Sequence, residues 1–266
     1  MKILCLVKLV PDVENFRYDF EKNVLVRENV HQVLNPEDAT ALTAALAVRE
    51  EFPGIRIETV TMAPRSAIAH LEDLVRRGVD RATLISDPLF VGSDTYGTSR
   101  ILSRYIETQS YDAIFTGTHS LDGGTAHVPA QIAQMLDLPQ MSQIVEIDGD
   151  SFGNGFAVID VDSEDAVCTF EIDLPAVLSF AYSTKRKLPY ISYENLHQEV
   201  RDRVHIVTNE ALGFERHEVG LEGSLTRVTG VEIQTFARKD TLFVLPDDEG
   251  IEQVYAFLVR KGFIRL

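Results

Sequence analysis

The sequence predicts an α/β protein with an open, doubly wound, mostly parallel sheet, an antiparallel extension and a C-terminal arm. Three observations support this fold class. Apolar strand-like runs alternate with helical segments through the first half of the chain, as in β-α-β units. The first run, 2–8, is almost continuously apolar, as in a parallel strand covered on both faces. After about residue 143, short turn signals separate the strands, as in hairpins.

The first half gives four strand–helix units in order. The clearest helix opens with Asn35 as N-cap, Pro36 at the first helical position and acidic residues in the first turn. Crossovers of this length imply parallel strands with right-handed connections. The expected strands are 2–8, 55–62, 81–87 and 111–117; the expected helices are 35–51, 65–78, 93–109 (capped at Ser93 or Asp94) and 127–138; two short strands at 16–20 and 23–27 flank a turn at 21–23.

The second half predicts hairpins and then an arm. The turn signals DGD, GNG and DSED divide the apolar runs between residues 143 and 182. After Tyr182 the sequence is polar and irregular, with one helix-like segment at 249–262. We therefore expect a domain at 1–182 and an arm at 183–266. The arm either wraps around a partner or is a loosely docked tail, and periodicity does not choose between these two.

Composition excludes several classes of function. Apolar residues make up 45% of the chain, and the net charge is −16 with one basic cluster at 184–187, so a nucleic-acid partner is not expected. No apolar run is long enough to span a membrane, and the start is unlike a signal peptide, so we expect a cytoplasmic protein. Cys5 and Cys168 lie in apolar runs without C-x-x-C spacing, so they are expected to be buried and no metal site is expected.

The segment 117–128 follows the fourth strand and has the composition of a phosphate loop. Gly117, Gly123 and Gly124 let backbone N–H groups approach a bound group closely, and Thr125 adds a hydroxyl donor. Asp122 would repel phosphate, so it caps the loop or meets a ribose hydroxyl. The loop should lie beside the ends of the first two strands and the start of the helix at 35–51. A tight turn without a ligand remains open, and no acid–base motif is present, so no catalytic residue is expected.

Several motifs together resemble the small (beta) subunit of electron transfer flavoproteins. They occur in family order between residue 3 and about residue 182, and they are LVKLVPD, NPEDATALTAAL, VTMAP, GVDRATLISD, GSDTYGTS, GTHSLDGGTAHVPAQIA and LPAVLS. The resemblance implies a Rossmann-like, adenine-nucleotide-binding fold. It assigns nucleotide binding to Leu6, Asn35, Asp38, Met62, Gly117, Thr118, His119, Ser120, Leu121, Asp122, Gly123, Gly124, Thr125, Ala126, His127 and Val128.

The same resemblance favours FAD over AMP as the nucleotide. Members that bind AMP carry a loop resembling DDDCNQT, whereas electron-bifurcating members that bind FAD carry DGDTAQV and GADTxATS. This chain has DGGTAHV and GSDTYGTS, which are closer to the second group. A flavin ring would then lie near Asp94, Thr95 and Thr98, with the two threonine hydroxyls as hydrogen-bond donors. Helix capping is the alternative role for those two threonines.

Departures from the family pattern bear on the partners. Gly124, His127 and Pro129 replace an acid, a glutamine and a glycine of the family, and His127 either tunes a flavin or faces solvent. The segment STKRKLPYISY lacks the arginine of the family's NxPRY, and the neighbouring segment that resembles the dehydrogenase recognition loop carries Tyr193, Glu194 and Leu196.

The resemblance implies two partners: a large (alpha) subunit and an FAD-dependent dehydrogenase of the lactate or acyl-CoA type. It further implies exchange of electrons with NAD(H). The alternatives are an AMP-binding subunit and a nucleotide-sensing module without electron transfer.

Overall fold

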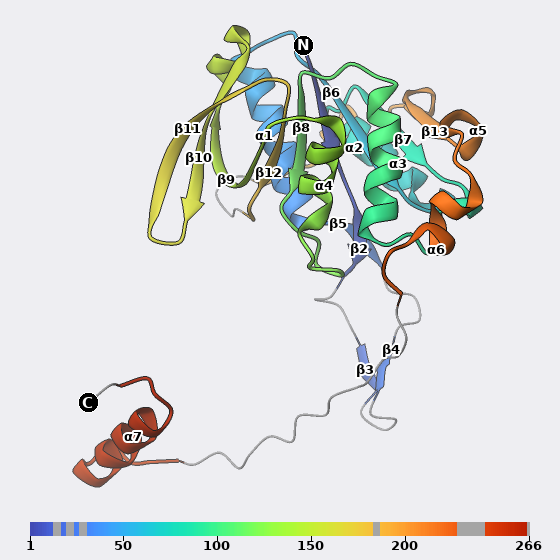
Figure 1. Cartoon of the computed structure of the whole chain (residues 1–266). Helices are drawn as coiled ribbons and strands as arrows, with labels where there is room; N and C mark the ends of the chain where they lie inside the picture. The colour runs from blue at the N-terminus through green and yellow to red at the C-terminus, as the bar shows by residue number, and fades with distance from the viewer. Residues whose placement is uncertain (13–16, 20–23, 27–30, 183–186, 228–242, 265–266) are drawn as a thin grey trace. The chain divides into compact units, whose positions relative to one another are not determined.

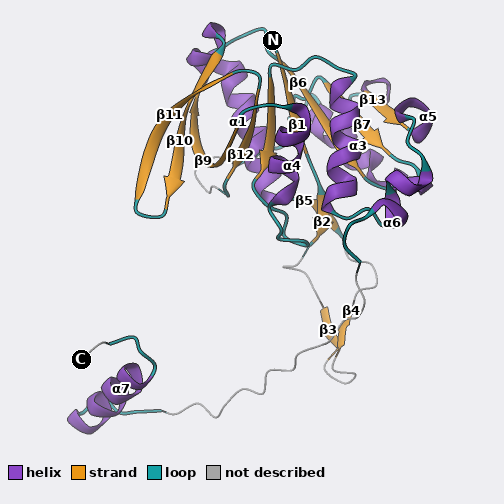
Figure 2. Cartoon of the chain, in the orientation of Figure 1, coloured by secondary structure: helices purple, strands orange, loops and turns teal. Residues whose placement is uncertain are grey.

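The computed structural model describes residues 1–12, 17–19, 24–26, 31–182, 187–227 and 243–264, and a nine-stranded sheet forms its centre (Figures 1 and 2). In sheet order the strands are β11 (Ala166–Asp173), β10 (Phe156–Ser163), β9 (Gln140–Asp148), β12 (Ala176–Phe180), β8 (Ala113–Gly117), β1 (Lys2–Leu6), β6 (Arg56–Met62), β7 (Arg81–Ile85) and β13 (Val204–Val207). In this order, every neighbouring pair from β9 through β12, β8, β1, β6 and β7 to β13 is parallel. The strand β10 is antiparallel to both of its neighbours, β9 and β11. The expected fold class is confirmed.

Helices cover both faces of this sheet. The helices α1 (Pro36–Glu51) and α2 (Ile68–Arg76) pack on one face, and α3 (Thr95–Glu107) and α4 (His127–Leu136) pack on the other. Along β1, Ile3 and Cys5 enter the first core, whereas Leu4 and Leu6 enter the second. Side chains of successive strand residues point to opposite faces, so a strand between two helical layers must be apolar throughout.

Short antiparallel pairs leave the main sheet after β1. The strand β2 (Leu9–Pro11) pairs with β5 (Gln32–Leu34), and β3 (Arg17–Asp19) pairs with β4 (Val24–Val26). The second pair corresponds to the two short strands expected at 16–20 and 23–27. The expected turn at 21–23 and all but the last residue of the basic run at 184–187 lie outside the described residues. Cys5 is buried as expected, but Cys168 is only half-buried, because β11 is the edge strand of the sheet.

The compact unit extends past the expected boundary at residue 182. It runs from Met1 to Arg227, because β13 adds a parallel strand beside β7, and α5 (Asn209–Leu212) and α6 (Gly220–Gly223) follow it. The side chains of Leu212, Phe214 and Val219 join the core beneath α3. Residues 187–227 are thus largely part of the folded domain, a correction to the expected arm at 183–266.

The second unit, Val228–Leu266, contains the helix α7 (Asp248–Arg260), which confirms the helix-like segment. Its N-cap is Asp247, whose side chain accepts a hydrogen bond from the N–H of Gly250 at 2.8 Å. Several of its large apolar side chains are exposed, including Ile251 and Phe257. Among the described residues of this unit, no apolar side chain of α7 is buried, so they supply no core that would stabilise the helix alone.

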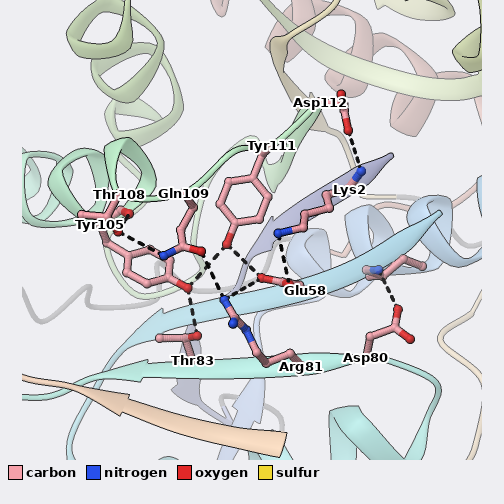
Figure 3. A network of polar contacts seen from close by, with 11 residues as sticks. Lys2, Glu58, Asp80, Arg81, Thr83, Tyr105, Thr108, Gln109, Tyr111 and Asp112 are labelled. Atoms are coloured by element: carbon pink, nitrogen blue, oxygen red, sulfur yellow. Dashed lines mark hydrogen bonds and ion pairs between the residues drawn. The ribbon is translucent and has the colours of Figure 1, made fainter.

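A buried polar network ties the strands together near their amino ends (Figure 3). Glu58 on β6 is 6% exposed, lies 3.0 Å from the guanidinium of Arg81, and accepts a hydrogen bond from the hydroxyl of Tyr111 at 3.0 Å. Burial, the hydrogen bond with Tyr105 and the Glu58 charge raise the pKa of Tyr111. The network thus lies at the amino ends of the parallel strands, on the side of the sheet opposite to their carboxyl ends.

In the described part of the chain, no helix is long and apolar enough to cross a membrane.

Candidate functional site

A cleft of about 430 Å³ lies at the carboxyl ends of β1, β6 and β8, a volume within the range of small-molecule sites. The loop after β8, the start of α4 and the start of α3 form its walls. Of the predicted residues, those that line it are Leu6, Asp38, Met62, Asp94, Thr95, Thr98, Gly117, Thr118, His119, Ser120, Gly123, Thr125, Ala126, His127 and Val128. The strand ends therefore converge as the sequence predicts.

The first turn of α1 holds the loop in place. Asn35 occupies the N-cap position, but its side chain makes no capping hydrogen bond, which corrects the expected capping role. Its amide instead donates to the carbonyl of His119 at 2.9 Å and accepts from the N–H of Leu121 at 3.1 Å. Asn35 and Leu121 thus brace the loop from behind and do not line the cleft.

Asp38 joins two strand ends beneath the cleft. Its carboxylate accepts hydrogen bonds from the N–H of Lys8 at 2.8 Å and from the N–H of Gly117 at 2.9 Å. Burial raises the pKa of Asp38 to about 7, against the hydrogen bonds from Lys8, Asn35 and Gly117, which lower it. The ionised form is costly in this position because burial removes the water around the carboxylate, and the hydrogen bonds that it accepts compensate only in part.

The loop glycines serve two different purposes. A Cβ atom on Gly117 would lie 2.5 Å from Asp38 Oδ1 and 2.6 Å from Glu37 Cβ, so this glycine lets α1 approach β8. Gly124 has a φ of +61°, which favours glycine, and lies outside the cleft lining. A Cβ on Gly123 would meet only Ser120 Oγ, at 3.5 Å. Of the three, Gly123 is the glycine at which a side chain would project without displacing the fold.

Asp122 turns toward Lys8. Its Oδ1 lies 2.7 Å from the ammonium of Lys8, whose Nζ also donates to Ser120 Oγ at 3.3 Å. Partial burial opposes ionisation, but the hydrogen bonds from Lys8 and Ser120 hold the pKa of Asp122 below its usual value. The carboxylate closes the loop onto the end of β1 and lies outside the cleft lining. Asp122 therefore connects the loop to β1 through a side-chain ion pair.

The start of α4 is suited to an anion. The helix has no side-chain cap, and its N-cap residue, Ala126, has a left-handed φ of +55°. Backbone N–H groups in the first turn of a helix need partners, and a phosphate supplies them. Thr118 also lines the cleft, and its buried hydroxyl has no hydrogen-bond partner within the described structure. An uncapped helix start and a buried, unpartnered donor indicate a ligand with oxygen acceptors.

The start of α3 forms the opposite wall. Asp94 is its N-cap, and its carboxylate accepts a hydrogen bond from the N–H of Gly97 at 2.9 Å. Because Asp94 caps the helix, capping does not account for Thr95 and Thr98, which line the cleft. Asp94 Oδ2 also accepts hydrogen bonds from the N–H and the hydroxyl of Thr226, both at 2.8 Å. Burial alone would raise the pKa of Asp94, but the hydrogen bonds from Gly97 and Thr226 hold it below its usual value.

Sequence reasoning missed some residues of the cleft. Glu37 contacts His119 but does not itself line the cleft; its sequence pattern is that of an ordinary acid in the first turn of a helix, where it complements the helix dipole. The apolar positions of the lining read as core. The lining residues outside the predicted set are Val7, Lys8, Val60, Thr61, Ser93, Leu102, Thr116 and Pro129.

Comparison with known proteins identifies the family. Residues 22–189 match the model described as "Electron transfer flavoprotein domain". The chain is 33% identical to an electron transfer flavoprotein subunit beta of Thermoanaerobacterium thermosaccharolyticum, over 96% of each chain. It is 32% identical to the caffeyl-CoA reductase-Etf complex subunit CarD of Acetobacterium woodii and 30% identical to the acryloyl-CoA reductase electron transfer subunit gamma of Anaerotignum propionicum, over 86% of each chain in both cases. Because the family match covers more than half of the sequence and the similarity to a beta subunit is nearly full-length, the chain belongs to the electron transfer flavoprotein family as a beta subunit.

Proposed function

We propose that this beta subunit binds FAD in the cleft and passes electrons between NADH and a partner flavoprotein dehydrogenase by flavin-based bifurcation or its reverse. One observation carries the proposal: a single cleft is lined by the uncapped start of α4, by Thr118 with its unpartnered hydroxyl, and by Thr95 and Thr98 on the opposite wall. The first two suit phosphate oxygens. The last two lie on the other side, where a ring system attached to the phosphates can extend.

The residues of the cleft fit a binding role. The N–H groups at the start of α4 and the hydroxyls of Thr118 and Thr125 would hold the phosphates, and Thr95 and Thr98 would donate to flavin ring atoms. The flavin, when bound, supplies the hydride and single-electron chemistry, and the protein supplies binding, orientation and electrostatics. No side chain of the cleft needs to act as a general acid or base.

The proposed partners are the large (alpha) subunit and an FAD-dependent dehydrogenase of the acyl-CoA or lactate type. Two of the similar proteins carry the names of CoA-thioester reductase complexes, which supports the acyl-CoA type. The lactate type rests on the unusual docking segment, where Tyr190 is 92% exposed and Tyr193 is 86% exposed. Exposed aromatic side chains of this kind are common anchors of protein interfaces. The cytoplasmic location expected from the sequence stays a prediction.

The nucleotide content of the purified heterodimer tests the proposal. The complex would be denatured, and the released flavin and AMP would be counted by chromatography against protein concentration. Two flavins per heterodimer are expected. One flavin with one AMP would instead support an AMP-binding subunit that assists a flavin elsewhere, and a complex without flavin would support a nucleotide-sensing module.

A further inference from the structure

The backbone and the Nδ1 atom of His119 are held by residues at the start of α1. Glu37 Oε2 accepts a hydrogen bond from the N–H of His119 at 2.6 Å, and Glu37 Oε1 lies 2.9 Å from its Nδ1. Asn35 Nδ2 donates to the carbonyl of the same residue at 2.9 Å. The side chain of Glu37 is 9% exposed, whereas that of His119 is 44% exposed and lines the cleft. A buried carboxylate therefore fixes both the backbone and the ring of a residue that faces the ligand site.

This contact determines what the ring offers to a ligand. Nδ1 must carry a proton to bond a carboxylate, so Nε2 is the ring nitrogen that a ligand in the cleft can reach. Nε2 donates a hydrogen bond when the imidazole is charged, and it accepts one when the imidazole is neutral. A phosphate oxygen is an acceptor and an anion, so it binds the charged donor form. Second partners of this kind orient a histidine ring and select its protonated nitrogen.

The other charged side chains that line the cleft, Lys8, Asp38 and Asp94, already have hydrogen-bond partners within the protein. The ammonium of Lys8 contacts Asp122 at 2.7 Å and Ser120 at 3.3 Å, both on the loop. Asp38 lies beneath the loop and accepts backbone hydrogen bonds. Apart from Lys8, the basic side chains among the described residues that line the cleft are His119 and His127. His127 is the first residue of α4. His119 is the base whose ring a buried carboxylate orients.

We propose that Glu37 is a positioning residue that holds His119 so that Nε2 binds a phosphate oxygen, and that this pair selects phosphorylated adenine nucleotides over adenosine. The proposal deepens the proposed function and rests on it, since it requires a nucleotide in this cleft. It adds a side-chain contact to the backbone donors at the start of α4. It also assigns a role to Glu37, which otherwise reads as a helix-terminal acid.

The test compares the affinities of AMP and adenosine for the heterodimer after its bound nucleotide has been removed, by isothermal titration. The variants are His119→Gln, Glu37→Gln and both together, with His205→Gln, at an exposed position of the edge strand β13, as the matched control. A hydrogen bond to a charged group corresponds to about tenfold or more in affinity. We expect His119→Gln to weaken AMP by about that factor and adenosine by less than about twofold. Glu37→Gln should give the same selective loss, and the double variant should lose no more than His119→Gln alone.

Three outcomes would overturn the inference. Equal losses for AMP and adenosine would show that the pair supports the fold of the site without contacting phosphate. Additive losses in the double variant would show that Glu37 does not act through His119. An unchanged AMP affinity in His119→Gln would remove the contact altogether, and this exposed side chain can be replaced even if Glu37→Gln fails to fold. A native complex that binds neither AMP nor FAD would instead refute the proposed function, so the two failures are distinguishable.

Discussion

Asp38 Oδ1 accepts a hydrogen bond from the N–H of Gly117 at 2.9 Å, and a Cβ atom on that glycine would lie 2.5 Å from the same oxygen. The first turn of α1 therefore rests directly on the end of β8. The other oxygen of Asp38 binds the N–H of Lys8 at the end of β1. One buried carboxylate thus sets the spacing between the end of β8 and the segment just after β1, which form the floor of the cleft.

The titration of Asp38 should make stability depend on pH. Its pKa is raised from 3.8 to about 7 in the folded chain. Between these values the native state binds a proton that the unfolded state has lost, so the free energy of unfolding falls as pH rises. The slope is about −1.4 kcal/mol per pH unit, and the contribution is constant above about pH 7, where both states are ionised.

The measurement is urea unfolding of the wild type and of Asp38→Asn between pH 4 and pH 8. The variant lacks this titration, so the difference between the two free energies should fall through the same interval and then level off. Other carboxylates titrate alike in both proteins and cancel. A difference that stays constant with pH would show that Asp38 is ionised throughout.

The loop glycines should respond differently to substitution. Gly117→Ala places a Cβ against Asp38 and Glu37 and should lower the free energy of unfolding by about 1–3 kcal/mol, as overpacked substitutions do. Gly123→Val meets only Ser120 Oγ at 3.5 Å, so its effect on stability should stay within about 0.5 kcal/mol while the nucleotide is lost. Denaturant unfolding and nucleotide content measure both effects. A folded Gly123→Val complex with full nucleotide would contradict the phosphate-loop assignment.

The sheet and the position of the cleft were predictable from the sequence for a physical reason. Continuous apolar strands require two covered faces, and parallel strands bring their carboxyl ends to one edge. The side-chain roles were less predictable, because they depend on contacts distant in sequence. Asn35 has the residue type of an N-cap, yet its amide binds the loop at His119 and Leu121.

The predicted end of the domain, at residue 182, was wrong because the segment that follows gives only a weak signal in the sequence. The strand β13 has four residues, Val204–Val207, and a run that short between polar segments gives a weak periodic signal. Its stability comes from pairing with β7 and from the burial of Leu212, Phe214 and Val219, all of them tertiary effects. Local pattern alone therefore read this segment as irregular.

Asp94 should stabilise both α3 and the segment that precedes the second unit. It caps Gly97 and accepts two hydrogen bonds from Thr226. Asp94→Ala should lower the free energy of unfolding by about 0.5–2 kcal/mol, the usual effect of losing a cap. It should also increase hydrogen exchange at the amide of Thr226. Unchanged exchange there would show that the side chain matters to the cap alone.

The helix α7 should gain protection from hydrogen exchange when the chain binds the large subunit. Its apolar residues Ile251 and Phe257 are exposed, and none of the described residues of this unit belongs to a hydrophobic core, so the isolated helix should be marginal. The amides of the central strand β1 serve as the internal control, since this strand pairs with β6 and β8 and should be protected in both states. Equal, strong protection of α7 in the free chain and in the complex would show that this unit folds by itself.

If FAD binds in the cleft as proposed, Thr95 and Thr98 should set its reduction potential. They line the cleft three residues apart on one face of α3, and the helix keeps its cap at Asp94 without them.

If the hydroxyls of Thr95 and Thr98 donate to the flavin ring, removing one changes how well the reduced, more anionic form is stabilised. A hydrogen bond to a charged group contributes about 1.5–3 kcal/mol. For a one-electron couple this corresponds to a shift of roughly 60–130 mV. Spectroelectrochemical titration and denaturant unfolding of Thr95→Ala and Thr98→Ala separate the roles. A contact with the ring predicts a shifted potential with little change in the free energy of unfolding, whereas a capping role alone predicts a lower free energy of unfolding and an unchanged potential. Unchanged potentials at full flavin occupancy in both threonine variants would exclude contact with the ring.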